Sequence, residues 1–390
     1  MNLKKEQKTK NKIQARKKNK LLTMRFTILV ILSVIVSSIY AGGVKKLNSH
    51  RGIDSASVQA FQLDDSLLWS CDSIYASCFT NSEELHPWEQ AYQFANDSIP
   101  AYLDTTYRER IESMDIKSPF SFQYNESVRR MILYYSNRRP KLISRALATK
   151  DFYFPIFEQL LDKYQLPMEL KYLAIVESAL NPRARSRAGA MGLWQFMPST
   201  GRLYGLHHNS KLDDRMNLYK ATEAACQHFS DLYAIYHDWN LVLAAYNAGP
   251  GNVNKAIRRA GTTTDYWAIR SYLPRETQSY VPAFVAVNYL MQYAEAHNIH
   301  AQKEGDNYYD YDTVYVSQKM TFKQIADWLD MDIKDIKHLN PQYKKNYIPA
   351  TAGRSYVITL PRNKIGEFIL NKHLILSGIS RKEYESQAER

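Results

Sequence analysis

Cysteine is scarce in this chain of 390 residues, which contains only three. Cys71, Cys78 and Cys226 form no C-x-x-C pair and leave one residue over, so the sequence indicates neither a disulfide scaffold nor a zinc ribbon. The ten histidines show no H-E-x-x-H spacing, and the chain has no G-x-x-x-x-G-K-[ST] loop for phosphates. We therefore predict that the protein uses no metal and no other cofactor.

Acidic residues are fewer than basic ones, but the imbalance is local. The chain has 51 Lys and Arg against 39 Asp and Glu, a net charge of +12. Residues 1–25 contain ten of the basic residues and a single acid, Glu6, so residues 26–390 are left with a net charge of +3. This distribution argues against a nucleic-acid partner. With 45% hydrophobic and 23% charged residues, the composition also excludes global disorder and a coiled coil.

Residues 26–44 form a run of nineteen residues without a charge, directly after the basic segment. As a helix this run would be about 28 Å long, close to the thickness of the hydrocarbon core of a bilayer. We predict a transmembrane anchor or signal segment, with residues 1–25 in the cytoplasm and the rest exported to the periplasm or cell wall. A buried core helix fits the flanking charges less well. Cleavage after Ala41-Gly42-Gly43 stays open, although the long basic segment favours an uncleaved anchor.

The rest of the chain divides by its hydrophobic periodicity. Residues 45–105 are rich in Ser, Asp and Asn and show no sustained period, whereas helical patterning begins at about Glu126 and continues to about residue 300. A polar linker then leads to a short β-α-α-β pattern, and the last segment is charged and helical. The predicted parts are a basic tail (1–25), an anchor or signal segment (26–44), a stalk (45–124), a helical domain (125–300), a small β-α-α-β domain (311–361) and a C-terminal helical tail (362–390).

One acid, Glu177, lies on the apolar face of a helix predicted from about residue 167 to 180. Residues three, four and seven positions before it, and three after it, are all apolar: Leu170, Leu173, Ala174 and Leu180. Burial and a place in the last turn of a helix both raise the pKa of a carboxyl group. A carboxylic acid that is still partly protonated near neutral pH suits general acid catalysis. The alternative is a structural Glu paired with a nearby Arg.

Two further segments combine small and aromatic residues. Residues 186–198 contain two glycines and two alanines beside Trp194 and Phe196, as expected where backbone approaches a ligand and rings offer flat surfaces. Residues 244–251 place Tyr246 and Asn247 just before a Gly-Pro-Gly turn, where a helix end presents polar groups. Each segment alone is compatible with plain packing. Their occurrence within 75 residues of Glu177 favours a cleft for a sugar.

Together these residues resemble the SLT-type lytic transglycosylase catalytic domain of the lysozyme-like superfamily, in particular its membrane-bound D-type members. The resemblance covers about residues 125–300 and has four motifs in family order: Glu177-Ser178; Ser186 with Ala188-Gly189-Ala190-Met191-Gly192-Leu193-Trp194-Gln195; Ala245-Tyr246-Asn247-Ala248-Gly249; and Glu276-Thr277-Gln278-Ser279-Tyr280-Val281. The family usually has Met where Trp194 stands. The implied fold class is mainly α, with a lysozyme-like helical domain followed by the small β-α-α-β domain.

The resemblance implies a peptidoglycan lytic transglycosylase. Such an enzyme cleaves the β-1,4 bond between N-acetylmuramic acid and N-acetylglucosamine without water and leaves a 1,6-anhydro sugar. Glu177 would protonate the glycosidic oxygen and then accept the proton of the 6-hydroxyl, which attacks as a tethered nucleophile. By the same resemblance, Ser186 would bond the acetamido group, Gln195, Tyr246 and Asn247 would orient the sugars, and Tyr280 would face the acid.

The β-α-α-β segment resembles a LysM peptidoglycan-binding module. Its matching segments are Thr321-Phe322-Lys323-Gln324-Ile325-Ala326, Leu339-Asn340-Pro341, Ile348-Pro349-Ala350 and Tyr356-Val357-Ile358-Thr359-Leu360-Pro361. The usual Gly-Asp-Thr-Leu is replaced by residues 319–322, Lys-Met-Thr-Phe. The implied partner is the peptidoglycan glycan strand, and a docking or spacer module of the same shape is the alternative.

Two other functions are compatible with the sequence. A goose-lysozyme-like hydrolase would share the fold and Glu177 but needs a second carboxylate to position water, for which Asp213 and Asp214 are available. A catalytically silent scaffold would bind the wall through both domains. Cys226 lies among apolar residues and is predicted to be a core residue rather than a reactive thiol.

Overall fold

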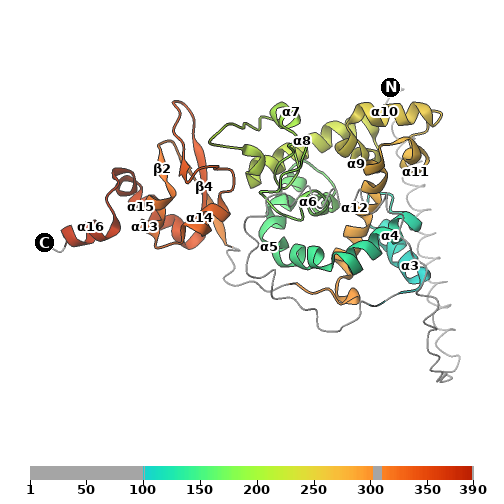
Figure 1. Ribbon diagram of the computed structural model, residues 1–390, viewed down its shortest axis with the longest axis horizontal. Helices are drawn as coiled ribbons and strands as arrows, with labels where there is room; N and C mark the ends of the chain where they lie inside the picture. Colours follow the sequence, from blue (N-terminus) through green and yellow to red (C-terminus); the bar gives the residue numbers. More distant parts are fainter. Residues whose placement is uncertain (1–99, 101, 302–309, 389–390) are drawn as a thin grey trace, which may run out of the picture. The chain divides into compact units, whose positions relative to one another are not determined.

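The computed structural model describes residues 100, 102–301 and 310–388 (Figure 1). The predicted basic tail, anchor segment and most of the stalk lie outside these residues. In the described part of the chain, no helix is both long and apolar enough to cross a membrane. The predicted anchor at residues 26–44 therefore stays a prediction.

Residues 102–301 form a helical domain. The periodicity predicts this domain from residue 125 onward, but residues 104–115, assigned to the stalk, are helical and pack into the same core through Tyr107, Ile111 and Met114. Its helical elements are α3 (Asp104–Asp115), α4 (Glu126–Leu133), the π-helical η3 (Tyr134–Arg138), α5 (Pro140–Lys163), the 3-10 helix η4 (Met168–Tyr172), α6 (Leu173–Ser178), α7 (Pro198–Leu203), η5 (Asp214–Met216), α8 (Leu218–Tyr236), α9 (Trp239–Ala248), α10 (Pro250–Arg259), α11 (Tyr266–Ile269), η6 (Arg270–Tyr272), α12 (Arg275–Tyr293) and η7 (Glu295–His297). The mainly α fold class is confirmed.

Helix α12 is the centre of this domain. Thirteen of its residues are buried, among them an unbroken run from Ser279 to Leu290. It packs against α4, α5, α6 and α9, and α6 lies with α5 on one side and α12 on the other (Figure 1). A helix that is apolar nearly all round is a core helix. The short helix α6, which carries Glu177, is therefore held against the most buried element of the domain.

Side-chain caps fix where several of these helices begin. The side chains of Asn125, Asn217 and Asp238 accept hydrogen bonds from backbone N–H groups in the first turns of α4, α8 and α9. Such caps satisfy donors that a helix leaves unpaired at its start.

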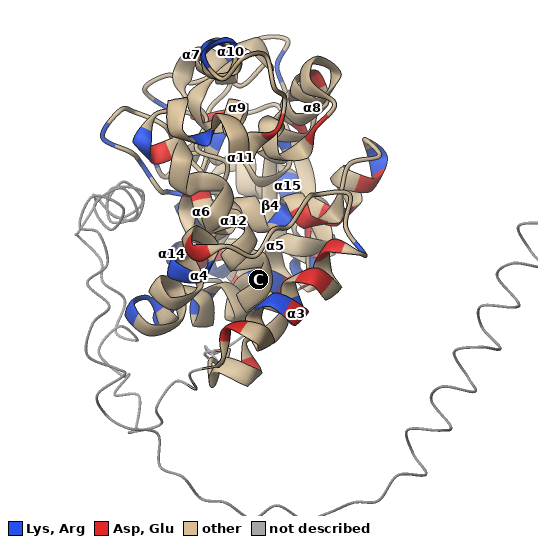
Figure 2. Cartoon of the chain, turned by 90° about the vertical axis from the view of Figure 1, so that its right-hand side faces the viewer, with Lys and Arg blue, Asp and Glu red and all other residues tan. Residues whose placement is uncertain are grey.

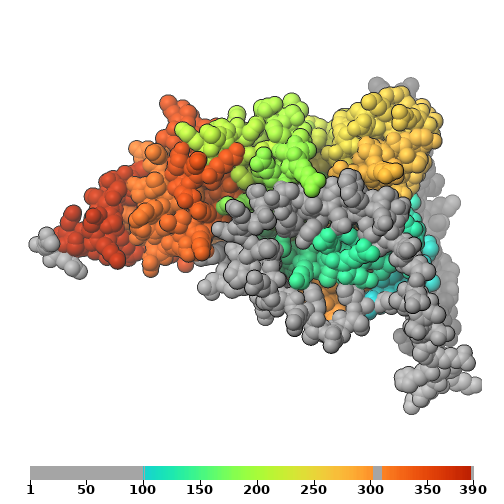
Figure 3. All heavy atoms as spheres, in the orientation of Figure 1, coloured from blue at the N-terminus to red at the C-terminus, as the bar shows by residue number. Residues whose placement is uncertain are grey.

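On the face drawn in Figure 3, the green to gold part of the chain, which contains α7 to α10, forms a continuous surface.

The second domain, which we call the LysM-like module, has the predicted β-α-α-β order. Strands β1 (Tyr311–Val316) and β4 (Tyr356–Pro361) pair antiparallel, with Val314 opposite Ile358. A second pair joins β2 (Met320–Thr321) to β3 (Tyr347–Ile348). Helices α13 (Phe322–Leu329) and α14 (Ile333–Leu339) lie between the strands in sequence, and a capping box of Thr321 and Gln324 starts α13.

The structure carries this module past residue 361, where the sequence analysis ends it. Helix α15 (Arg362–Ser377) packs on β1, β4 and α13, and its Phe368 and Ile375 are fully buried in the core of the module. Helix α16 (Arg381–Ala388) follows. The apolar residues of α15 do not form a clear stripe in the sequence, which is why the segment reads as a separate tail.

Charged side chains of both signs are interspersed over the described residues. Figure 2 shows Lys and Arg next to Asp and Glu on most helices, without a face of one sign in this view. This arrangement agrees with the near-neutral net charge expected for the chain after residue 25.

The burial of Phe368 predicts that α15 stabilises the module. We expect Phe368→Ala to lower the free energy of unfolding of this region by about 3 to 5 kcal/mol, because the substitution removes buried area and leaves a cavity. Leu370, on the same helix and 75% exposed, is the matched control. Leu370→Ala should change stability by less than about 0.5 kcal/mol. Urea unfolding followed by hydrogen exchange of residues 310–376 measures both, and equal effects would contradict the packing described.

Candidate active site

Glu177 lies in the last turn of a short helix, as the sequence analysis expects. The single helix predicted over residues 167–180 is in fact a 3-10 turn, η4, that continues into α6 and ends at Ser178. Ala179 and Leu180 then adopt left-handed backbone conformations, with φ of 49° and 60°. Left-handed backbone is unfavourable for residues with a Cβ and recurs at functional sites. The helix is thus stopped sharply just after the acid.

The Glu177 carboxyl group faces Tyr280 of α12. The Tyr280 hydroxyl donates a hydrogen bond to Glu177 Oε1, and its side chain is 1% exposed. Burial raises the pKa of Glu177 to about 8, the Tyr280 hydrogen bond opposes that rise, and the negative charge of Glu276 adds to it. At neutral pH the Glu177 carboxyl group is therefore protonated in most of the molecules. This is the state that a general acid requires.

A second tyrosine, Tyr246 at the end of α9, lies close to the same carboxyl group. Burial first, and then the charge of Glu177, hold the pKa of the Tyr246 and Tyr280 hydroxyls well above their usual value. Both hydroxyls are therefore neutral hydrogen-bond donors. Tyr246 donates to the carbonyl oxygen of Trp194 at 2.7 Å, and its ring stacks on Phe229 with centroids 4.9 Å apart. Tyr246 thus connects the acid to the segment that contains Gln195.

We call residues 189–196 the glycine-rich loop. Isolated bridges pair Met191 with Arg185 and with Phe196, so the loop folds back on itself. The buried Ser178 hydroxyl, next to Glu177, lies 3.0 Å from the Leu193 carbonyl. These bonds attach the loop to the end of α6.

Gln195 itself has a left-handed backbone, with φ of 46°. Its side-chain amide donates to the carbonyls of Ala184 and Gly192 at 3.1 and 2.8 Å. Only Oε1 is left over, buried and without a partner among the described residues. The NH2 group of Gln195 therefore holds the loop, and Oε1 is the atom that can accept a bond from a ligand.

Ser186 and Asn247 are tied to backbone and side-chain neighbours. Ser186 Oγ accepts a bond from Ala190 N–H at 2.9 Å, which leaves the hydroxyl proton able to donate. Asn247 Oδ1 accepts from Thr277 Oγ at 2.7 Å, and its amide lies 3.3 Å from Glu276 Oε1. This links the end of α9 to the first turn of α12, about one turn before Tyr280.

The structure thus joins most of the site residues proposed from the sequence through direct contacts. Tyr280 contacts Glu177, Tyr246 reaches the loop that contains Gln195, and Asn247 contacts the segment that contains Tyr280. Ser186 borders the same loop at its N-terminal end. Sequence reasoning assigned no role to Glu276, whose charge acts on the acid; its place four residues before Tyr280, one turn along a helix, was the available signal.

Asp213 and Asp214, which a hydrolase could use, are buried in ion pairs. Arg215 contacts Asp213 at 2.8 Å, and Lys220 contacts Asp214 at 3.1 Å. Their oxygens are thus engaged by cations and are not poised to activate a water molecule. Cys226 is fully buried in the core of the helical domain, and burial raises the pKa of its thiol to about 12, as expected for a core residue.

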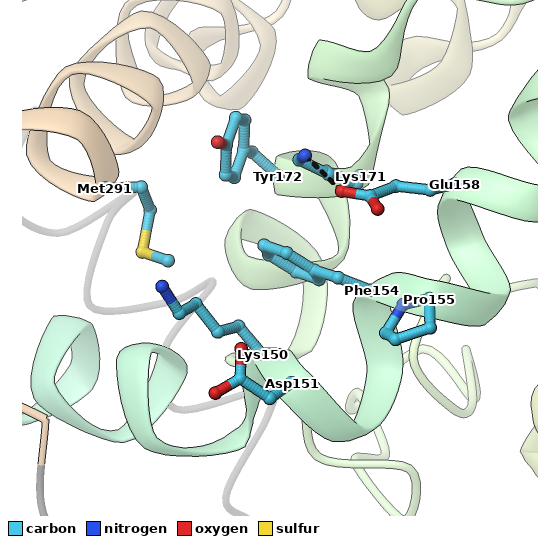
Figure 4. A pocket seen from close by; sticks show the side chains of 8 residues that line it. All are labelled: Lys150, Asp151, Phe154, Pro155, Glu158, Lys171, Tyr172 and Met291. Carbon is cyan, nitrogen blue, oxygen red and sulfur yellow. Dashed lines mark hydrogen bonds and ion pairs between the residues drawn. The ribbon is translucent and has the colours of Figure 1, made fainter.

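A cavity of about 320 Å³ lies between α5, η4 and α12 (Figure 4). Lys150 and Met291 point into it, and Lys171 pairs with Glu158 at its rim. Its lining residues are Lys150, Asp151, Phe154, Pro155, Glu158, Lys171, Tyr172 and Met291. None of these is a site residue expected from the sequence. The cavity is therefore distinct from the surroundings of Glu177.

Gly192 is required for the shape of the loop. A Cβ at this position would lie 2.0 Å from the Arg215 carbonyl oxygen, and the φ of 86° also disfavours any other residue. We expect Gly192→Ala to destabilise the protein by roughly 1 to 3 kcal/mol more than Gly189→Ala. Gly189 is the matched control because its φ is 92° but no atom lies within 4 Å of its would-be Cβ. Thermal unfolding compares the variants, and equal stabilities would contradict the close approach of Arg215.

Comparison with known proteins agrees with this geometry. Residues 154–269 match the family described as Transglycosylase SLT domain, and residues 310–376 match the family described as Lytic transglycosylase MltD, LysM-like domain. The first match contains Glu177, the glycine-rich loop and Tyr246. The second runs through most of α15, as the packing of that helix indicates.

Among named proteins, the chain is 32% identical over 238 residues to Membrane-bound lytic murein transglycosylase D of Escherichia coli K12, covering 60% of this chain and 52% of that protein. It is 32% identical over 145 residues to a Putative soluble lytic murein transglycosylase of Haemophilus influenzae, covering 35% and 24%. The chain therefore spans about half the length of the first of these relatives.

A solved structure, the 70 kDa soluble lytic transglycosylase SLT70 of E. coli, is similar with a TM-score of 0.33 and 19% identity, covering 53% of this chain and 39% of that one. The two matched families supply the more specific evidence. Residues 154–269 are thus similar to a transglycosylase SLT domain, and residues 310–376 are similar to the LysM-like domain of the lytic transglycosylase MltD.

Proposed function

We propose that the protein is a peptidoglycan lytic transglycosylase that cleaves the β-1,4 bond between N-acetylmuramic acid and N-acetylglucosamine and leaves a 1,6-anhydromuramic acid end. The observation that carries this proposal is the partly buried Glu177 carboxyl group, which accepts a hydrogen bond from Tyr280 and whose pKa is raised by desolvation to about 8. The SLT-domain match and the names of the relatives support the same substrate class.

In the proposed reaction the single carboxyl group of Glu177 acts first as general acid and then as general base. Glu177 donates its proton to the glycosidic oxygen as the bond to the anomeric carbon breaks. The resulting carboxylate then accepts the proton of the 6-hydroxyl of the same muramic acid, whose oxygen forms the new bond to the anomeric carbon. The Tyr280 hydroxyl donates to Glu177 and stabilises the carboxylate between the two steps. No water enters the balance.

The surrounding residues are proposed to hold the sugars. The hydroxyl proton of Ser186 would donate to the acetamido carbonyl, since Ser186 Oγ itself accepts a backbone N–H. Gln195 Oε1, together with the side chains of Tyr246 and Asn247, would orient the sugar rings. The Tyr246 hydroxyl also fixes the glycine-rich loop through its bond to the Trp194 carbonyl. We further propose that the enzyme acts outside the cytoplasm, anchored through residues 26–44, and that the LysM-like module adds a contact to glycan.

A hydrolase with a second carboxylate is the alternative. Asp213 and Asp214 are engaged in buried ion pairs, which favours the single-acid mechanism over one in which either residue positions water. The products distinguish the two mechanisms, because hydrolysis adds the elements of water and the proposed reaction does not.

The first test is the product mass after digestion of purified peptidoglycan. We expect muropeptides one water lighter than their reducing-end counterparts, and at least roughly 100-fold less product from Glu177→Gln, because an amide cannot donate the proton. Glu169→Gln, eight residues earlier on η4, is the control and should retain wild-type activity. Reducing ends would contradict the proposal, as would normal turnover by Glu177→Gln.

The second test is the dependence of the rate on pH. The protonated form of Glu177 is the acid, so kcat/KM should fall as pH rises through about 8, where the carboxyl group ionises. Glu276→Gln removes a negative charge that raises this pKa, so the fall should move to lower pH. Glu112→Gln, at an exposed position of α3, should leave the profile in place. A fall that stays at the same pH in Glu276→Gln would refute the assigned charge effect.

A further inference from the structure

The segment between α7 and α8, residues 207–217, belongs to the helical domain in sequence but contacts the LysM-like module. Leu212 is 2% exposed and is buried in the core of the module, where it forms an isolated bridge with Tyr343. Asp213 N–H donates to the Gln342 carbonyl at 2.9 Å, and Lys344 N–H donates to the Lys211 carbonyl at 3.0 Å. Backbone bonds on both sides of Leu212 thus fix the segment to the module.

The same segment also supports the glycine-rich loop. The guanidinium of Arg215 donates through Nη1 to the carbonyls of Gly189 and Phe196, at 2.8 and 3.0 Å. These two residues are the first and last of the loop that contains Gln195. The carbonyl of Arg215 also occupies the space where a Cβ of Gly192 would lie. Arg215 therefore closes the loop at both ends and packs against its middle.

Arg215 is held in turn by Asp213. Nε and Nη2 of Arg215 donate to the two carboxylate oxygens of Asp213 at 2.9 and 2.8 Å, a bidentate pair that fixes the plane of the guanidinium. Both side chains are buried, with 6% exposure for Arg215 and 0% for Asp213. A buried pair of this kind is costly to desolvate, and removing one partner is strongly destabilising because it leaves an uncompensated buried charge.

The module completes the charge balance around this pair. Lys344 Nζ lies 3.7 Å from Asp213 Oδ2, and Arg354 Nη2 lies 3.3 Å from Oδ2 of the neighbouring buried Asp214. Lys220 of α8 contacts the other oxygen of Asp214. Of the cations that contact these two carboxylates, Arg215 and Lys220 come from the helical domain, and Lys344 and Arg354 come from the module.

We propose that the LysM-like module positions the glycine-rich loop for catalysis, through Asp213 and Arg215, in addition to any contact that it makes with glycan. Arg215 is a positioning residue: it acts on the substrate through the loop that contains Gln195. The proposal rests on the proposed function for the reaction that it affects. Without the module, Asp213 and Asp214 lose two cations and Leu212 loses its pocket, so the loop loses a fixed support.

The test removes the two cations of the module and leaves the buried pair in place. In the full chain, Lys344→Gln and Arg354→Gln are combined, and backbone hydrogen exchange is measured over residues 189–196. We expect exchange in this loop to become several-fold faster and kcat to fall by about 3- to 10-fold, the size of effect that remote coupling produces. KM and binding to insoluble peptidoglycan should stay within about twofold of wild type.

Lys323→Gln is the matched control. Lys323 is also on the module, but its side chain is 75% exposed and pairs with Asp327 on its own helix. This variant should leave loop exchange and kcat unchanged. Lys344→Arg combined with Arg354→Lys keeps both charges and should restore most of kcat, which a loss of overall stability would not predict.

The outcomes separate this proposal from the proposed function. Unchanged exchange in residues 189–196 would overturn the coupling, and so would faster exchange with an unchanged kcat. A drop in peptidoglycan binding that accounts for the whole loss of activity would also overturn it, because the module would then act only by holding glycan. If the wild type forms no anhydro products, the proposed function fails, while the exchange comparison still decides whether the module supports the loop.

Discussion

The contact between the Glu177 carboxyl group and the Tyr280 hydroxyl is the interaction on which the site depends. A carboxyl group among apolar side chains is stable when it is neutral or well hydrogen-bonded, and the environment of Glu177 provides both conditions. That environment requires α12 to be buried almost throughout and α6 to end just after the acid. The core of the helical domain and the chemistry of the site therefore come from the same packing.

From this contact, hydrogen bonds extend to the remaining parts of the site. Tyr246 joins the surroundings of the acid to the glycine-rich loop, and Arg215 closes that loop at its two ends. Asp213 then connects Arg215 to the LysM-like module. Each link is a short, directional bond between groups that are buried or partly buried. A displacement at one end can thus be transmitted to the loop, which is the physical basis of the coupling that we propose.

The sequence predicts the parts of this structure that follow from local periodicity. The apolar positions around Glu177 indicate its inward orientation, and alternating and helical patterns indicate the β-α-α-β order of the module. The short strands β2 and β3 are not predicted. It does not predict that residues 168–172 form a 3-10 turn or that Ala179 and Leu180 are left-handed, because tertiary contacts impose these conformations. The role of Asp213 depends on residues of the module that are distant in sequence.

The protonation state of Glu177 is the central claim, and direct titration tests it most closely. Carbon-13 NMR of protein labelled at the glutamate carboxyl groups, compared between the wild type and Glu177→Gln, follows this group without any substrate. The account predicts one resonance that titrates near pH 8 and is missing in Glu177→Gln. A Glu177 resonance that titrates near 4 to 5, with the other glutamates, would contradict the account.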